Sequence, residues 1–268
     1  MSKDSLGDRI KDYEGRTQVL LPRKTYSVIR LDGKAFHTYT KGLNRPYDLD
    51  LMSDMDETAK YLCENIAGTI LAYTQSDEIT LILADFKEGS YKTQAWFDGN
   101  LQKCVSISAS LATAKFNQLR TCRKMTAIGL DLYALNKKDY PPKLACFDSR
   151  IFTISDPWEI QNILVWRNQD CVRNSVQMAA QSMFSHKELQ GVNVTQLQEK
   201  MWAEKQVNWN DYPTGFKNGR VVTKEAISEN RTGWVIQPAP IFSKEPEFVL
   251  SRLPYYYNPK LNDNQSSD

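Results

Sequence analysis

The sequence has few of the residues on which most metal centres and disulfide frameworks depend. Its 268 residues include only two histidines, His37 and His186, and its five cysteines are far apart, with no Cys-x-x-Cys pair. This composition disfavours a disulfide framework, a thiolate zinc site and a metal held by several imidazoles. Any metal ion would need oxygen ligands, and such a donor set favours magnesium.

Long apolar runs and a strong excess of charge are also missing. The longest apolar runs, such as TILAY and ITLIL, fall far below the roughly 18 residues that cross a bilayer, and the charged start MSKDSLGDRIKD is unlike a signal peptide. We therefore expect a cytoplasmic protein with no membrane partner. The formal net charge of +2 does not indicate a nucleic-acid binder. Two local clusters are nevertheless candidates for a basic patch: Arg120, Arg123 and Lys124, and Lys137, Lys138 and Lys143.

The remaining composition, 41% hydrophobic and 25% charged, is that of an ordinary globular chain. Hydrophobic periodicity predicts two helices, at residues 50–67 and 105–119. It predicts four strands, at residues 25–31, 69–74, 78–84 and 147–154. The order strand, helix, strand, strand, helix, strand is that of an α+β, ferredoxin-like fold (βαββαβ), the architecture of a polymerase palm.

The second half of the chain predicts an extension packed on this palm. We expect residues 1–155 to form the catalytic domain, 156–253 a helical and β-hairpin extension, and 254–268 a flexible tail. Asp156 followed by Pro157 indicates the start of one or two helices.

Two further signals place elements inside this extension. Thr195 with Gln198 is typical of a capping box and predicts another helix. The hairpin is expected around ENRTG, with strands at residues 219–224 and 233–241.

Two acidic residues are predicted to meet at one edge of the palm sheet. Asp32 ends the first strand in RLDGKAFH, and Asp77 lies between the second and third strands in QSDE. Taken singly, an Asp-Gly pair between apolar residues is more often a hairpin turn, and acidic turns are common. Brought together by the topology, the two carboxylates would repel each other unless they shared divalent cations, and two Mg²⁺ ions there would serve phosphoryl or nucleotidyl transfer. Gly33 would let the backbone approach a ligand, and the amides of KAFHTYT would cradle a triphosphate.

Several segments together resemble the tRNA(His) guanylyltransferase family. They are RLDGKAFHTYTKG, YTQSDEITLIL, FDSRIF and WRNQDC, within similar motifs that run in the same order from about residue 5 to 242. The resemblance implies a palm domain, a homotetramer built as a dimer of dimers, and 3′-to-5′ addition of nucleotides to the 5′ end of tRNA. It also implies that ATP adenylylates a 5′-monophosphorylated end, which the 3′-hydroxyl of GTP or another nucleoside triphosphate then attacks, releasing AMP.

The same resemblance assigns roles to individual residues. Asp32, the carbonyl of Gly33 and Asp77 would hold two magnesium ions, and Asp32, Asp77 and Glu78 would be the catalytic residues. The nucleotide-binding residues that it implies are Gly33, Lys34, Ala35, Phe36, His37, Lys41, Ser76, Lys103 and Lys205. The candidate RNA contacts are Arg150, Arg167 and Arg173. Ion pairs within the fold are the alternative for Arg150 and Arg167, a structural role for His37, and a solvated surface charge for any single lysine.

One departure from the family favours a particular branch. Members dedicated to tRNA(His) carry a His-x-x-Asn-Asn element directly after WRQ-x-D-C, whereas this chain has the run from Cys171 through Val172 and Arg173 to Asn174 and Ser175. This favours the Thg1-like branch, which repairs 5′-truncated tRNA by template-dependent addition. Untemplated guanosine addition to tRNA(His), a palm-type nucleotide cyclase that binds no RNA, and a catalytically silent RNA-binding subunit are the alternative functions.

Overall fold

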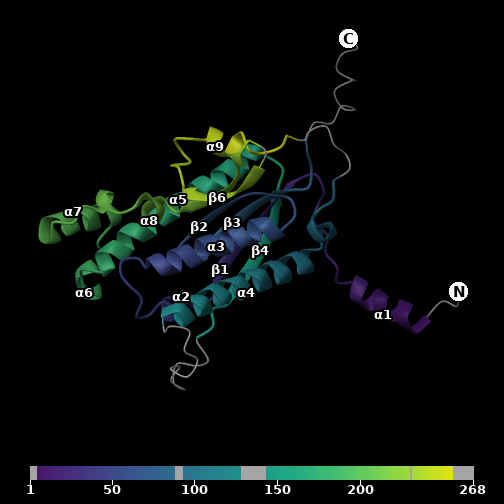
Figure 1. Cartoon of the computed structure of the whole chain (residues 1–268), viewed down its shortest axis with the longest axis horizontal. Coiled ribbons are helices and arrows are strands. Elements are labelled where there is room, and N and C mark those ends of the chain that lie inside the picture. The colour runs from purple at the N-terminus through teal and green to yellow at the C-terminus, as the bar shows by residue number, and fades with distance from the viewer. Residues whose placement is uncertain (1–4, 88–92, 128–142, 230, 256–268) are drawn as a thin grey trace, which may run out of the picture.

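The computed structural model describes residues 5–87, 93–127, 143–229 and 231–255 (Figure 1). Its centre is an antiparallel sheet with the strand order β4-β1-β3-β2-β5-β6. The strands are β1 Tyr26–Gly33, β2 Thr69–Gln75, β3 Glu78–Ala84, β4 Phe147–Ile154, β5 Arg220–Ser228 and β6 Arg231–Pro238. The helices are α1 Ser5–Gly15, α2 Phe36–Tyr39, α3 Leu49–Asn65, α4 Leu101–Ala127, α5 Pro157–Gln181, α6 His186–Leu189, α7 Val194–Lys205, α8 Thr214–Asn218 and α9 Glu247–Leu250. Two 3₁₀ turns span Trp96–Gly99 and Trp209–Asp211.

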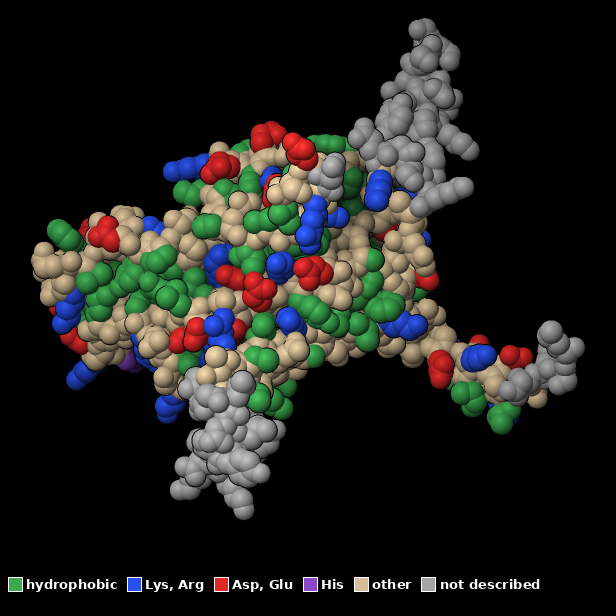
Figure 2. Space-filling model, viewed as in Figure 1, with side chains coloured by type: hydrophobic (Ala, Val, Ile, Leu, Met, Phe, Trp, Pro, Cys, Tyr) green, Lys and Arg blue, Asp and Glu red, His purple; other side chains and the backbone are tan. Residues whose placement is uncertain are grey.

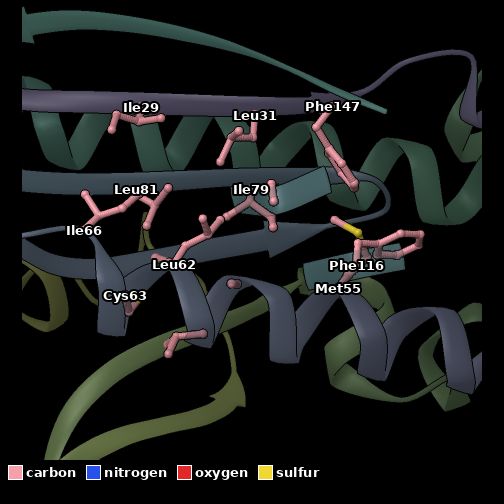
Figure 3. Packing of buried hydrophobic residues seen from close by; sticks show 14 of the residues in the cluster. Ile29, Leu31, Met55, Leu62, Cys63, Ile66, Ile79, Leu81, Phe116 and Phe147 are labelled. Atoms are coloured by element: carbon pink, nitrogen blue, oxygen red, sulfur yellow. The ribbon is translucent and has the colours of Figure 1, made fainter. Parts of the chain in front are cut away.

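Helices cover both faces of the sheet. Because side chains alternate along a strand, Ile29 and Leu31 of β1 face α3 and α4, where they pack with Phe116 in one core cluster (Figure 3). Val28 lies on the opposite face and packs in a second cluster with Leu164 of α5. The end of β1 that carries Asp32 therefore belongs to a sheet that is packed on both faces.

The palm prediction is confirmed in element order and in pairing. β1, α3, β2, β3, α4 and β4 follow one another as the periodicity indicates, and β4 has the predicted bounds. α4 is longer than predicted, because the weakly patterned turns at both of its ends continue the helix. The β5–β6 hairpin pairs with β2 and so continues the same sheet.

The capping box before α7 is not at Thr195 and Gln198, as the sequence pattern predicts. Asn193 is the N-cap instead: its side chain accepts a hydrogen bond from the amide of Gln196, whose own side chain reaches back to the amide of Asn193. Thr195 is the second residue of the helix. Both spacings fit the pattern, and the asparagine, a stronger N-cap residue than threonine, takes the position.

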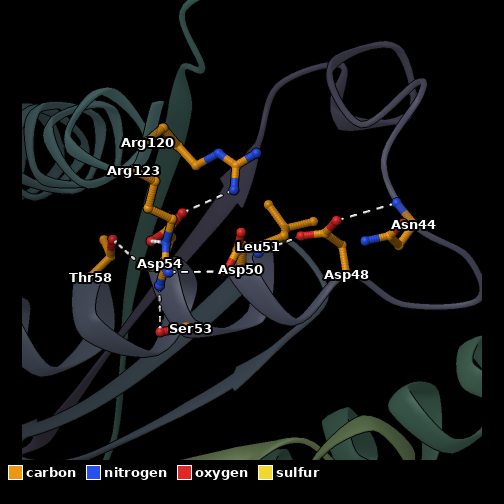
Figure 4. A network of polar contacts seen from close by, with 9 residues as sticks. All are labelled: Asn44, Asp48, Asp50, Leu51, Ser53, Asp54, Thr58, Arg120 and Arg123. Carbon is orange, nitrogen blue, oxygen red and sulfur yellow. Dashed lines mark hydrogen bonds and ion pairs between the residues drawn. The ribbon is translucent and has the colours of Figure 1, made fainter. Parts of the chain in front are cut away.

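A buried carboxylate joins α3 to α4. Asp54 is fully buried and accepts hydrogen bonds from Arg120 at 3.0 Å and from Arg123 at 2.6 Å (Figure 4). Arg123 also bonds to Asp50 and Ser53. The two arginines are therefore used inside the fold, and the basic patch considered from the sequence is wrong for them.

On the face of the molecule seen in Figure 2, lysine and arginine side chains are interspersed with aspartate and glutamate, and hydrophobic side chains gather at the end that carries α6, α7 and α8. In the part of the chain that the structure describes, no helix is long and apolar enough to cross a membrane.

Candidate functional site

The turn between β2 and β3 holds Asp77 beside the end of β1. Gln75 pairs with Glu78 across a two-residue turn, in which Ser76 adopts a left-handed conformation with φ of 46°. The amide of Gly33 donates a hydrogen bond of 3.1 Å to the carbonyl oxygen of Asp77. This bond ties the turn to the strand that carries Asp32, so the two aspartates converge at one sheet edge, as predicted.

The environment of Asp77 disfavours its ionised form. Partial burial raises the pKa of its carboxyl, and the nearby charge of Asp32 raises it further, whereas a 2.9 Å hydrogen bond from the Ser76 hydroxyl acts in the opposite direction. Two neighbouring carboxylates, one of them short of water, are stabilised by a bound cation. The local electrostatics thus suit a cation site.

Gly33 is required by packing. A Cβ atom at this position would lie 2.2 Å from the ring of Phe36. That ring is buried and packs against Phe116 and Phe147, with centroids at 5.6 and 5.2 Å. From the sequence, Gly33 was expected to let a ligand approach the backbone closely. In the structure, the overlap of a Cβ atom with the ring of Phe36 is a reason for the glycine that needs no ligand.

Residues 35–37 present unused amides just after the Asp32 edge. Ala35 lies in the left-handed region with φ of 55°, and Lys34 donates its amide to the carbonyl oxygen of Cys146 at 2.8 Å. Among the described residues, the amides of Ala35, Phe36 and His37 have no hydrogen-bond acceptor. The predicted triphosphate cradle has the donors that it needs, and its role stays a prediction.

A cleft of about 460 Å³ opens beside these residues. Its lining includes His37, Asp48, Ser76, Asp77 and Met178. This volume falls in the range of small-molecule sites, roughly 300–1,000 Å³. A smaller, more apolar cavity of about 60 Å³ shares Asp48, Ser76 and Met178 with the cleft and continues it toward α5.

Glu78 points to α5 and forms a buried ion pair. Its Oε1 lies 2.7 Å from Nε of Arg167, which also contacts Asp170 at 2.7 Å. Burial raises the pKa of Glu78, and the charge of Arg167 partly offsets this. Burial also favours the neutral form of Asp170, but hydrogen bonds from Arg173 and Arg167 lower its pKa overall. For Arg167, one of the candidate RNA contacts, the structure shows the alternative, ion pairs within the fold. Arg173, another candidate, also pairs with Asp170, but its side chain stays half exposed.

The predicted lysines do not gather at the cleft within one chain. Lys103 lies in the first turn of α4. The part of α4 near Asp32 is marked by Asn117, which bonds to Ala145 just before β4. Asn117 is 14 residues further along the helix, so Lys103 lies roughly 21 Å away from it. Lys205 ends α7, with its Nζ 5.4 Å from the ring of Phe184.

The remaining predicted residues lie at or near the surface. Lys34 and Lys41 are exposed close to the cleft, but they are not part of its lining. Arg150 is exposed on β4, 3.6 Å from Asp148.

Two residues near the edge escaped the sequence analysis, and a third, Lys143, was considered only for a basic patch whose Lys137 and Lys138 lie outside the described residues. Asp148 lies directly opposite Asp32 on β4, a relation that follows from strand register. Asp48 caps α3 and lines the cleft, and the sequence signal was its position before a helical pattern. Lys143 donates a hydrogen bond to the carbonyl oxygen of Thr38, next to the unused amides.

The donor set at the edge suits magnesium, since it consists of carboxylate and carbonyl oxygens alone. Within the described ranges, no group of three or more His, Cys, Asp and Glu side chains is arranged to hold a metal ion. The proposed set of Asp32, Asp77 and the Gly33 carbonyl contains two such side chains, so a nucleotide would have to supply the other ligands.

Known proteins resemble this chain in sequence and in fold. A family model described as tRNAHis guanylyltransferase matches residues 7–155. A bacterial tRNA(His) guanylyltransferase (Thg1)-like protein in complex with ATP is 40% identical and superposes with a TM-score of 0.80 over 95% of this chain and 100% of that one. A bacterial protein of the same description in complex with GTP is 37% identical, with a TM-score of 0.72 over 93% and 99% of the two chains.

The tRNA(His) guanylyltransferase of Schizosaccharomyces pombe is 26% identical over 234 residues, which are 82% of this chain and 80% of that protein. The family model covers more than half of the chain, and the structural likeness extends over nearly all of it. The chain therefore belongs to the tRNA(His) guanylyltransferase family.

Proposed function

We propose that this protein is a magnesium-dependent nucleotidyltransferase that adds nucleotides to the 5′ end of tRNA in the 3′-to-5′ direction. The observation that carries the proposal is the convergence of Asp32 and Asp77 beside a cleft of nucleotide size. Relatives have been solved with ATP and with GTP, which supports nucleoside triphosphates as substrates.

In this proposal the residues of the sheet edge hold the reacting groups. Asp32, Asp77 and the carbonyl of Gly33 would bind two magnesium ions, which would neutralise phosphate charge and activate the attacking oxygen. The Ser76 hydroxyl orients the carboxylate of Asp77 through its 2.9 Å hydrogen bond. Glu78 supports the edge from its ion pair with Arg167.

The residues after β1 bind the triphosphate. The amides of residues 35–37 donate to phosphate oxygens, and the His37 side chain, which lines the cleft with Asp77, donates another hydrogen bond. The exposed Lys34 and Lys41 add positive charge nearby. ATP first adenylylates the 5′-phosphate of the RNA with loss of pyrophosphate. The 3′-hydroxyl of the incoming nucleotide then attacks that phosphorus, and AMP leaves.

We further propose that addition is templated and serves 5′-end repair. One residue in the run that replaces the His-x-x-Asn-Asn element is used for packing: Ser175 is buried, and its hydroxyl accepts a 3.2 Å hydrogen bond from Nε1 of Trp209. Ser175 is therefore not available to read an anticodon. Sequence choice would then come from base pairing, with the protein reading the shape of the RNA end.

Two further expectations belong to this proposal. Lys103 and Lys205 do not line the cleft of their own chain, so they could contact its nucleotide only from another copy, as in a homotetramer. The mass of the purified protein in solution tests this. The cytoplasmic location stays a prediction, and imaging of the tagged protein tests it.

The deciding experiment offers a tRNA lacking its first nucleotide, with a 5′-monophosphate, together with ATP and each labelled nucleoside triphosphate in turn, while the opposing base is varied. We expect the added nucleotide to follow the opposing base. Guanosine added regardless of that base would favour maturation of tRNA(His), and a cyclic product formed without RNA would favour a cyclase. Asp32→Ala serves as the inactive control.

A further inference from the structure

On the sheet face toward α5, next to the catalytic edge, two pairs of residues with the same charge stand opposite each other on neighbouring strands. Asp32 of β1 stands directly opposite Asp148 of β4. Two residues before Asp32 and two residues after Asp148, Arg30 stands directly opposite Arg150 on these antiparallel strands. Residues two apart on a strand point to the same face and lie roughly 7 Å apart. The arginine pair, Arg30 with Arg150, is thus the first feature reached on leaving the edge along the sheet.

The arginine pair is unfavourable for the fold. Like charges directly opposite each other on neighbouring strands destabilise a sheet. In the described part of the chain, Arg30 forms no hydrogen-bonded ion pair, although its charge lowers the pKa of the nearby Glu78, and its Nε is buried without a hydrogen-bond acceptor. Arg150 has only the exposed carboxylate of Asp148, at 3.6 Å. Two guanidinium groups with unused donors are a binding surface for an anion.

An exposed aromatic ring completes this surface. Trp166 of α5 is 50% exposed, and its ring lies 5.8 Å from the guanidinium carbon of Arg30 and 4.4 Å from that of Arg167. Phe152, in the next row of β4, is 41% exposed on the same face. An indole ring backed by guanidinium groups and open to solvent is a platform on which a nucleobase can stack.

We propose that Arg30, Arg150 and Trp166 bind the RNA strand next to its reacting 5′ end, the two arginines through backbone phosphates and the tryptophan by stacking on a base. This inference rests on the proposed function and names the surface that receives its RNA substrate. RNA is the occupant because it offers phosphates and exposed bases together, beside the edge where its 5′ phosphate must react. A second copy of the chain would have to bring carboxylates to the same place.

The test measures binding of a hairpin RNA that mimics a 5′-truncated acceptor stem, by fluorescence anisotropy over a range of salt concentrations. Arg150→Ala should weaken binding about tenfold and reduce the slope of log K against log salt by about 1, the signature of a lost phosphate contact. Trp166→Ala should weaken binding about fivefold or more and leave the slope unchanged, because stacking releases no counterions.

Matched controls are available on the same chain. Arg16→Ala removes an exposed arginine directly after α1, and Trp202→Ala removes a 56% exposed tryptophan of α7. Both should bind RNA as the wild type does. Wild-type binding by Arg150→Ala and Trp166→Ala would overturn the proposal.

A fall in oligomer mass in those two variants would also overturn it, by identifying the surface as a subunit interface. If the wild type itself bound no RNA, the proposed function would fail, and this inference with it.

Discussion

Glu78 and Arg167 form an ion pair in which both side chains are about nine-tenths buried, with 2.7 Å between Oε1 and Nε. Removing one partner of such a pair leaves a charge without compensation in a region of low dielectric constant. Glu78 directly follows Asp77, so this pair also ties the turn between β2 and β3 to α5.

Arg167→Met should lower the free energy of unfolding by about 3–5 kcal/mol, because it leaves the buried Glu78 unpaired. Chemical denaturation measures this. The double variant Arg167→Met, Glu78→Gln should regain much of the loss. Arg173→Ala, which breaks a more exposed ion pair with Asp170 on the same helix, should cost less than about 1 kcal/mol. Equal losses in the two single variants would contradict the structural role of the pair.

Asp77→Asn should abolish nucleotide addition, with a loss of at least about a hundredfold, since it removes a ligand for the cations that stabilise the transition state. In the absence of metal it should also make the protein more stable at pH 7. The pKa of Asp77 is higher in the folded state than its ordinary value of 3.8, so its ionisation costs stability as the pH rises above that value. At pH 7, well above 3.8, this loss of stability is present, and Asp77→Asn removes it.

Denaturation of the metal-free wild type and of Asp77→Asn between about pH 3.5 and 7.5 measures how the difference in their free energies of unfolding changes with pH. The stability advantage of the variant should shrink as the pH falls toward 3.8 and should vanish below it, where the carboxyl becomes protonated in the unfolded state as well as in the folded state. Asp148→Asn, which removes one negative charge from an exposed carboxylate at the same edge, is the matched control. An advantage that grew toward low pH would contradict the burial of Asp77.

Gly33→Ala should destabilise the protein by about 1–3 kcal/mol, because the added Cβ overlaps the ring of Phe36. Replacing the ring with a smaller side chain in the double variant Gly33→Ala, Phe36→Leu should recover part of this loss. The losses of stability in the two single variants should therefore not be additive. Thermal unfolding of the four proteins in this cycle measures the coupling. Additive effects would show that the glycine is needed for another reason.

The sequence predicted the topology because its signals were strong and local. Alternating apolar residues marked the strands, helical spacing marked α3 and α4, and Asp156 with Pro157 marked the start of α5. The meeting of Asp32 and Asp77 followed from that topology alone.

Other features depended on relations between distant segments. The opposition of Asp32 to Asp148 and of Arg30 to Arg150 is a matter of register between strands more than 100 residues apart. The reason for Gly33 lies in the side chain of Phe36, which sequence periodicity does not place. The distance of Lys103 from the edge follows from the length and direction of α4, which the residue type does not reveal.

The central claim is that Asp32 and Asp77 hold the divalent cations on which the reaction depends. A crystal grown with Mn²⁺ in place of Mg²⁺ and a non-hydrolysable nucleoside triphosphate tests it directly through the anomalous signal of manganese. We predict anomalous peaks at roughly 2.1 Å from carboxylate oxygens of both Asp32 and Asp77, with the triphosphate completing the coordination. Peaks elsewhere, or a nucleotide bound in the cleft with no metal at these carboxylates, would contradict the claim.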